Sequence, residues 1–327
     1  MPDPARARIA VVIPSYKVTR HVLAVIAAVP AVVARIYVVD DACPEGSGRL
    51  VERECRDPRV TVVFLPQNRG VGGAVVAGYH AAINDGNDVM VKIDGDGQMD
   101  PALIPEFVLP ILSGEADYTK GNRFYDLLHI HAMPRLRIFG NAVLSLLSKL
   151  STGYWDLFDP TNGYTALHAD VARRLPLDHL SQRYFFESDL LFRLNTMRAR
   201  VVDVPMDAHY ADEVSNLRIR RIVGEFLFAH LRNLLKRLFY NYYLREMSLA
   251  SIELPIGLAL LGFGTVFGIV NWVHYARLHE AAPTGTVVLA ATTALVGLQF
   301  LLAFLAYDIA AVPRRAIHRR APPPDRA

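Results

Sequence analysis

The sequence predicts an α/β domain with a mostly parallel sheet, followed by two membrane-spanning helices. Short apolar runs alternate with helix-like segments over the first 210 residues, which is the pattern of β-α-β units. Acidic residues and glycines follow these runs, at the strand ends where parallel sheets bind ligands. Two long uncharged runs, residues 254–273 and 285–307, are each long enough to cross a hydrocarbon core.

The composition is that of a folded protein. Of the 327 residues, 52% are hydrophobic and 20% are charged, which excludes a disordered chain. The net charge of +3 gives no support for a nucleic-acid partner. Only Cys43 and Cys55 are present, so a disulfide framework is excluded and a reducing compartment is expected.

Each predicted element of the N-terminal part has its own apolar pattern. Strands are expected at residues 9–13, 36–40, 60–65 and 89–94, where β-branched residues dominate. Helices are expected between them, at residues 21–34, 48–55 and 73–84.

The charges that flank the two apolar runs predict their orientation. Residues 218–245 carry seven basic side chains against Glu225, and the second run is followed by Arg314, Arg315, Arg319 and Arg320. The connection at residues 274–284 holds only Arg277 against Glu280. The positive-inside rule therefore places both ends in the cytoplasm. The alternative, two buried helices of a large soluble core, is disfavoured by the length of the runs.

The segment before the first apolar run predicts helices that lie in the membrane interface. Apolar residues recur there at helical spacing, and basic residues supply the polar side. These basic residues are Arg218, Arg221, Arg232, Lys236 and Arg237. The expected domains are a cytoplasmic catalytic domain (1–215), interfacial helices (216–250), a transmembrane anchor (251–310) and a basic cytoplasmic tail (311–327).

Carboxylates at two strand ends predict a metal site. Asp40 and Asp41 end the second strand, and Asp94-Gly-Asp-Gly-Gln98 ends the fourth. Carboxylates at alternate positions, with glycine between them, can converge on one hard cation such as Mg²⁺ or Mn²⁺. Such a cation keeps coordination positions open for phosphate oxygens.

These motifs together resemble family 2 glycosyltransferases, which have the GT-A fold. The resemblance rests on the segments Val11-Val-Ile-Pro-Ser-Tyr16, Val38-Val-Asp-Asp41, Asn68-Arg-Gly-Val-Gly-Gly-Ala74, Asp94-Gly-Asp-Gly-Gln98, Lys120-Gly-Asn-Arg123, Asp159-Pro-Thr-Asn-Gly-Tyr164 and Phe186-Glu-Ser-Asp189. Within the family the sequence is most similar to polyprenyl-phosphate glycosyltransferases of the dolichol-phosphate mannose synthase type. The resemblance covers residues 9 to about 215, and the two C-terminal runs fit the membrane-anchored members.

The resemblance implies a set of donor-binding residues. It assigns the nucleotide sugar to Pro14, Tyr16, Asp40, Asp41, Asn68, Gly70, Asp94 and Asp96. It assigns Mg²⁺ or Mn²⁺ to Asp94, Asp96 and Gln98, with Asp96 also counted as catalytic. After Asp41 the sequence departs from the family's D-x-S-x-D-x-T pattern, which leaves the contacts of that loop open.

The resemblance also implies an acceptor side. Arg123, Arg137 and Arg218 are expected to bind the acceptor phosphate, because a guanidinium fork matches phosphate geometry. Glu187 and Asp189 lie where many family members place a catalytic base. A phosphate acceptor is already anionic near neutral pH, so either acid could be structural instead.

The expected function is inverting, metal-dependent transfer of a hexose from a UDP- or GDP-linked sugar to a polyprenyl phosphate at the inner membrane. Two alternatives stay open: a GT-A enzyme acting on a sugar hydroxyl, and a non-catalytic membrane scaffold. A processive synthase is disfavoured because its Q-x-x-R-W motif is absent. The sugar, the nucleobase and a homo-oligomeric state are not determined by the sequence.

Overall fold

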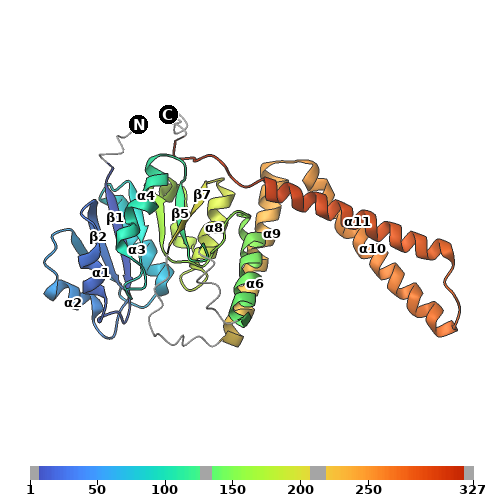
Figure 1. The fold of residues 1–327 in the computed structure, drawn as a ribbon, viewed down its shortest axis with the longest axis horizontal. Helices are drawn as coiled ribbons and strands as arrows, with labels where there is room; N and C mark the ends of the chain where they lie inside the picture. The colour runs from blue at the N-terminus through green and yellow to red at the C-terminus, as the bar shows by residue number, and fades with distance from the viewer. Residues whose placement is uncertain (1–6, 126–134, 207–218, 320–327) are drawn as a thin grey trace. The chain divides into compact units, whose positions relative to one another are not determined.

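The computed structural model describes residues 7–125, 135–206 and 219–319. The chain divides into two compact units. The N-terminal unit comprises residues 1–234 and 313–327, and the hairpin unit comprises residues 235–312. Figure 1 shows the elements of both units.

A seven-stranded sheet forms the centre of the N-terminal unit (Figure 1). Its order is β3-β2-β1-β4-β6-β5-β7, and only β6 runs antiparallel to its neighbours. The strands are β1 (Ile9–Ser15), β2 (Val33–Asp40), β3 (Val60–Phe64), β4 (Val89–Lys92), β5 (Tyr118–Asn122), β6 (Thr165–His168) and β7 (Val201–Pro205). The mostly parallel sheet and the four predicted strands are confirmed.

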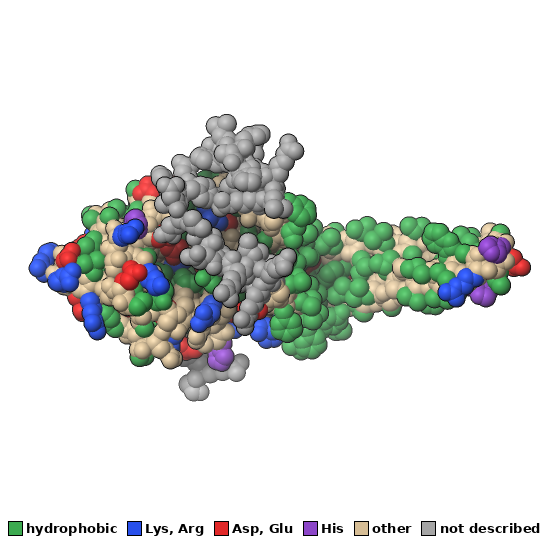
Figure 2. All heavy atoms as spheres, turned by 90° about the horizontal axis from the view of Figure 1, so that it is seen from below, with side chains coloured by type: hydrophobic (Ala, Val, Ile, Leu, Met, Phe, Trp, Pro, Cys, Tyr) green, Lys and Arg blue, Asp and Glu red, His purple; other side chains and the backbone are tan. Residues whose placement is uncertain are grey.

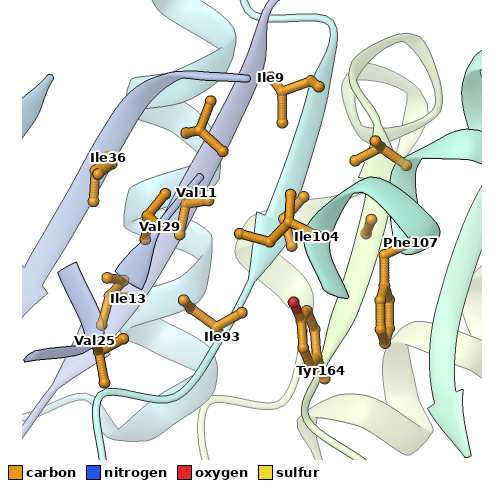
Figure 3. Packing of buried hydrophobic residues seen from close by; sticks show 14 of the residues in the cluster. Ile9, Val11, Ile13, Val25, Val29, Ile36, Ile93, Ile104, Phe107 and Tyr164 are labelled. Carbon is orange, nitrogen blue, oxygen red and sulfur yellow. The ribbon is translucent and has the colours of Figure 1, made fainter. Parts of the chain in front are cut away.

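Helices cover both faces of the sheet. The helices of this unit are α1 (Val22–Ala28), α2 (Ser47–Glu54), α3 (Gly70–Asn84), α4 (Ile104–Leu112), α6 (Arg135–Thr152), α7 (Ala169–Arg174) and α8 (Phe186–Thr196). Val25 of α1 and Ile104 and Phe107 of α4 pack with Val11 of β1 in one apolar cluster (Figure 3). On the other face, Gly78 of α3 lies so close to Val12 that an added Cβ would be 2.3 Å from it.

The first helix is shorter than the sequence predicts. The expected helix covers residues 21–34, whereas α1 ends at Ala28 and β2 already begins at Val33. Pro30 explains the difference, because proline cannot donate the backbone hydrogen bond that would continue a helix.

Residues 313–319 pack on the N-terminal unit. Asp117, just before β5, accepts backbone N–H bonds from Ile317 (2.9 Å) and His318 (3.0 Å) and a bond from Nδ1 of His318 (2.7 Å). The His318 ring stacks on His168, with centroids 4.2 Å apart. Arg200 donates to the carbonyl of Pro313 at 3.0 Å. These residues form a docked segment, which we call the C-terminal strap.

The hairpin unit consists of two long apolar helices and the end of the segment that precedes them, since α9 (Ile219–Phe239) begins in the N-terminal unit and enters the hairpin unit at residue 235. α9 continues into a π-helical turn (Tyr240–Arg245), followed by α10 (Leu249–Leu278) and α11 (Thr284–Ala310). α10 and α11 are each long and apolar enough to cross a membrane. In the most apolar 18-residue stretch of each helix, 11% (α10) and 17% (α11) is buried within the protein. Figure 2 shows hydrophobic side chains along the visible face of this hairpin.

Small residues and one buried ion pair hold the hairpin together. A Cβ added to Gly297 of α11 would lie 2.3 Å from the backbone nitrogen of Leu261 in α10, so the two backbones are very close. Arg237 and Asp308 are both buried and form two hydrogen bonds of 2.6 and 2.9 Å. The expectation that Arg237 faces lipid headgroups is therefore wrong, because its charge is used inside the protein.

Candidate active site

The predicted site residues follow strands that end at the same edge of the sheet. β1, β2 and β4 pair in parallel, and β5 runs in the same direction because β4 and β5 both pair antiparallel with β6. Asp40 ends β2, Asp94 follows β4 and Arg123 follows β5. This edge is where ligands bind in open α/β sheets.

Asp40 orders the loop that follows β2. Its buried carboxylate accepts backbone N–H bonds from Cys43 at 2.7 Å and from Gly48 at 2.6 Å. A carboxylate has about four acceptor positions, so Asp40 can still accept a bond from a ligand. The loop after Asp41, where the sequence departs from the family pattern, is therefore held by hydrogen bonds to Asp40.

Asp41 holds the start of α3. Its two oxygens accept the N–H groups of Arg69 (2.6 Å) and Gly70 (2.8 Å), and its carbonyl accepts from the amide of Asn68 (3.2 Å). Gly70 has a φ of +82°, and a Cβ there would lie 2.7 Å from the carbonyl oxygen of Gln182. Asn68 and Gly70 thus lie beside Asp41 in a tight turn at the start of α3.

A pocket of about 630 Å³ opens beside Asp40. Its lining combines the half-exposed ring of Phe64 with the polar groups of Asp40, Arg49 and Glu52. Flat apolar and hydrogen-bonding groups together suit a heteroaromatic ring. The other two predicted donor residues lie at the end of β1: Pro14 is half-buried, and Tyr16 is 43% exposed.

Cys43 also lines this pocket. Its sulfur accepts the backbone N–H of Lys17 at 3.1 Å and lies 3.0 Å from Oγ of Ser47. Burial by itself raises the pKa of this thiol, but the hydrogen bonds from Ser47 and Lys17 lower it overall.

The donor atoms of Asp94, Asp96 and Gln98 fit a hard divalent cation. Asp96 accepts the backbone N–H of Gln98 at 3.0 Å, which fixes a turn after β4. A Cβ on Gly163 would lie 2.9 Å from Oδ2 of Asp94, so glycine leaves this oxygen room. Within the described residues no three Asp, Glu, His or Cys side chains form a cluster, so a cation here would take further oxygens from water or phosphate.

A buried lysine lies next to this site. Lys92, the last residue of β4, is 2% exposed, and its ammonium lies 2.8 Å from Asp94 and 3.5 Å from Glu187 of α8. Burial alone would lower the pKa of Lys92, but Asp94 and Glu187 raise it above its usual value. Lys92 was not identified from the sequence, although a lysine inside an apolar strand was a signal for it.

The two acids of α8 have different surroundings. Glu187 faces Lys92, whereas Asp189 is buried and accepts bonds from the N–H of Ser181 (3.0 Å) and the amide of Asn233 (3.1 Å). Asp189 also contacts Arg193 at 3.3 Å. Asp189 therefore ties α8 to a loop and to α9, whereas Glu187 shares the ammonium of Lys92 with the strand-end residue Asp94.

Arg123 is paired with a buried acid. Its Nε and Nη2 donate to the carboxylate of Asp159 at 2.7 and 3.1 Å. Lys120, two strands from Lys92 and fully buried, donates to the carbonyl of Asn162. Burial lowers the pKa of Lys120 to about 8. Arg123 and Lys120 thereby hold the loop at residues 159–164.

The side chains of two predicted phosphate ligands lie outside the described part of the structure. Arg137 belongs to α6, but its side chain lies outside the described part, and Arg218 lies outside the described residues altogether. Their assignment to the acceptor phosphate stays a prediction.

The fold and the strand-end motifs can now be compared with known proteins. The family model described as "Glycosyl transferase family 2" matches residues 10–175. The chain belongs to glycosyl transferase family 2. It is a glycosyltransferase, and the resemblance that the motifs indicated is confirmed.

The curated relatives include proteins that are named for polyprenyl-phosphate substrates. It is 34% identical over 173 residues to the undecaprenyl-phosphate mannosyltransferase of Micrococcus luteus, covering 52% of this chain and 70% of that protein. It is 29% identical over 213 residues to the polyprenol monophosphomannose synthase of Mycolicibacterium smegmatis, covering 62% and 80%.

Solved structures show the same fold at low sequence identity. Glucosyl-3-phosphoglycerate synthase of Mycobacterium tuberculosis, solved with Mn²⁺ and UDP, matches with a TM-score of 0.52 and 19% identity over 71% of this chain and 80% of that one. Mannosyl-3-phosphoglycerate synthase of Rubrobacter xylanophilus matches with a TM-score of 0.54 and 16% identity over 75% and 80%.

Proposed function

We propose that this glycosyltransferase moves a hexose from a nucleotide diphosphate sugar to a polyprenyl phosphate, with inversion, at the cytoplasmic face of the membrane. The observation that carries the proposal is the combination of a family 2 domain with two helices apolar enough to span a membrane. The names of the relatives from Micrococcus luteus and Mycolicibacterium smegmatis support the acceptor class.

The donor would bind across the carboxyl ends of β1, β2 and β4. The pocket beside Asp40 would take the nucleobase, with Phe64 as its flat surface and Tyr16 at the end of β1. Asp94, Asp96 and Gln98 would hold Mg²⁺ or Mn²⁺ against the diphosphate. Such a cation neutralises the charge that develops on the leaving nucleotide.

The acceptor would approach from the side of Arg123 and Glu187. A phosphate monoester is anionic near neutral pH, with a second pKa of about 6, so it needs charge relief and orientation rather than deprotonation. Glu187 adjoins Lys92 and can orient groups at the site, while Asp189 is committed to packing. We therefore propose no essential catalytic base.

Two helices of the N-terminal unit present apolar surfaces that suit a membrane. α9 exposes Leu227, Phe228 and Leu231, while its buried face carries the polar His230 and Asn233. This is the reverse of a helix on a water-exposed surface. In α6 the side chains of Phe139, Val143 and Leu146 are exposed at helical spacing. These faces support the proposal that the site works at the lipid headgroups.

A direct test combines a donor panel with two acceptors. Purified full-length protein is incubated with radiolabelled UDP- and GDP-sugars, Mn²⁺ or Mg²⁺, and either polyprenyl phosphate or free polyprenol. We expect a radiolabelled organic-soluble product with the phosphate and none with the free alcohol. Equal transfer to polyprenol would assign the enzyme to the hydroxyl-acceptor class.

The metal is tested by Asp96→Asn. Loss of an anionic ligand should reduce the transfer rate at least about 100-fold, because charge neutralisation in the transition state contributes several kcal/mol. Undiminished transfer by the variant, or by the wild type in excess chelator, would refute the metal assignment. An unchanged melting temperature shows that the variant is folded.

A further inference from the structure

Lys92 carries a positive charge beside the proposed metal site at Asp94, Asp96 and Gln98. It lies in a strand whose other residues are Val89, Met90 and Val91, and all four are buried. Its ammonium contacts Oδ1 of Asp94 at 2.8 Å, while Oδ2 of Asp94 lies toward Gly163. Lys92 thus engages one of the two oxygens that Asp94 could offer to a metal.

Lys92 also joins two elements. Glu187 comes from α8 and lies 3.5 Å from the same ammonium, so one buried charge is shared by a strand-end acid and a helix acid. A buried charge needs such partners to offset the loss of hydration. The other buried lysine, Lys120, donates to the Asn162 carbonyl instead. The pairing with two carboxylates therefore belongs to Lys92 in particular.

We propose that Lys92 is a positioning residue that holds Asp94 as a one-oxygen metal ligand and keeps the cation weakly bound until a nucleotide diphosphate arrives. This inference rests on the proposed function. The ammonium repels a divalent cation at the same carboxylate, and a diphosphate supplies the negative charge that offsets this repulsion. The metal and the nucleotide sugar would then bind together, and without the nucleotide sugar the site would bind a divalent cation only weakly.

The test measures Mn²⁺ affinity, which requires neither sugar transfer nor an acceptor. Wild type, Lys92→Met and Lys120→Met are titrated with Mn²⁺ by paramagnetic resonance, with and without a nucleoside diphosphate. We expect Lys92→Met to bind Mn²⁺ more tightly without nucleotide, on the order of tenfold, because one neighbouring charge changes the proton affinity of a carboxylate by a similar factor. The nucleotide should then strengthen Mn²⁺ binding less than in the wild type, and kcat should fall.

Lys120→Met is the matched control. It also removes a buried ammonium and disturbs the core, but Lys120 pairs with a carbonyl oxygen rather than with Asp94. Lys120 interacts with Glu187 and Lys92 only through space, so the Mn²⁺ affinity of Lys120→Met should change much less than that of Lys92→Met, even if its melting temperature falls. A general disruption of the site would weaken Mn²⁺ binding in both variants.

The proposal is overturned if Lys92→Met binds Mn²⁺ as weakly as the wild type or more weakly, or if the wild type binds no Mn²⁺ with nucleotide present. Lys92→Gln gives a second neutral variant if Lys92→Met does not fold, and the same tightening is expected. Tighter Mn²⁺ binding in a protein that transfers no hexose would uphold the role of Lys92 and refute the proposed function.

Discussion

At the scale of single residues, two basic side chains near the site are paired with carboxylates of the protein. Lys92 contacts Asp94 and Glu187, and Arg123 forms a two-point contact with Asp159, which is 1% exposed. Arg123 therefore has two tasks if it also binds the acceptor phosphate: it neutralises Asp159 and it contacts the ligand. A guanidinium has five donors, so both tasks are compatible.

Replacing Arg123 by alanine should reduce kcat/KM for polyprenyl phosphate about 10- to 150-fold. The estimate corresponds to the loss of one charge-assisted contact of about 1.5–3 kcal/mol. Glu187→Gln should reduce kcat/KM no more than this, because a phosphate acceptor needs no base. Steady-state rates from pH 5 to 8 make the comparison, and activity should fall on the acid side near pH 6 with the acceptor's second ionisation.

Asp159→Asn is the control for the structural task of Arg123. It removes the buried partner but leaves the guanidinium in place, so it should retain more activity than Arg123→Ala. The assignment fails if Asp159→Asn and Arg123→Ala lose activity equally. A nearly inactive Glu187→Gln with a mild Arg123→Ala would instead indicate a hydroxyl acceptor.

The sequence predicts which residues stand at the strand ends but not how their charges pair. Asp40, Asp94 and Arg123 follow apolar runs, and this pattern alone places them at one edge of the sheet. The contact between Arg123 and Asp159 joins residues 36 positions apart, so no local pattern reveals it. The ion pair of Lys92 with Glu187 depends on how α8 packs and is equally invisible from spacing.

At the scale of elements, His230 should make the packing of α9 sensitive to pH. It is buried, and its Nδ1 lies 2.7 Å from Oγ of Ser151 in α6. Burial lowers the pKa of His230 to about 4. The unfolded chain binds a proton more readily, so the free energy of unfolding should decrease as the pH falls from about 6.5 towards 4.

This effect should cost about 2 kcal/mol at pH 5 relative to pH 7.5. His230→Asn cannot be protonated in this range but keeps a polar group for Ser151, so its stability should depend less on pH. Urea unfolding of both proteins at pH 5.0 and 7.5 measures the difference. His80→Asn, which replaces a half-exposed histidine, should show the wild-type dependence, and an equal dependence in His230→Asn would contradict the argument.

Close packing of α10 against α11 should make Gly297 intolerant of a side chain. A Cβ there would meet the backbone of Leu261 at 2.3 Å, and backbone cannot move aside as a flexible side chain can. Gly297→Leu should therefore lower the melting temperature in detergent by several degrees, since overpacking costs about 1–3 kcal/mol. Gly262→Leu is the control because, apart from its own stretch of helix, no described atom lies within 4 Å of its Cβ position. Equal melting temperatures for the two variants would argue against the packing.

Prediction of the elements succeeds where a pattern is local. The four N-terminal strands and the two apolar helices follow directly from runs of apolar residues. The polar side of α9 was partly misassigned, because helical spacing shows which residues share a face but not what that face contacts. Arg232 and Lys236 are exposed as expected, whereas Arg237 pairs with Asp308, 71 positions away.

At the scale of the whole molecule, both ends of the hairpin unit continue into segments that pack on the N-terminal unit. Before the hairpin, His230 and Asn233 of α9 bond to Ser151 and Asp189. After it, the C-terminal strap bonds to Asp117. The expected basic tail at residues 311–327 thus includes residues, from 313 on, that complete the N-terminal unit, and their burial could not be inferred from their charge.

The strap should therefore stabilise the fold of the N-terminal unit. Asp117 is fully buried and accepts bonds from Ile317, His318 and the backbone N–H of Arg200. Burial raises the pKa of Asp117, but these bonds, those of His318 above all, lower it overall, so the folded state favours the carboxylate. Asp117→Asn replaces one acceptor oxygen with an NH₂ group that faces other donors. The cost should be about 2–3 kcal/mol, because each lost bond to a charged group leaves a buried donor unpaired.

For a domain of this size, that cost corresponds to a fall in melting temperature of about 5–10 °C. Truncation after Val312 should have an effect at least as large, since it removes every bond of the strap at once. Scanning calorimetry of the full chain in detergent measures both. Arg315→Ala changes an exposed residue of the same segment and should shift the melting temperature by less than about 2 °C. If truncation and Arg315→Ala behave alike, the strap contributes no stability, and its contacts with Asp117 are incidental to the fold.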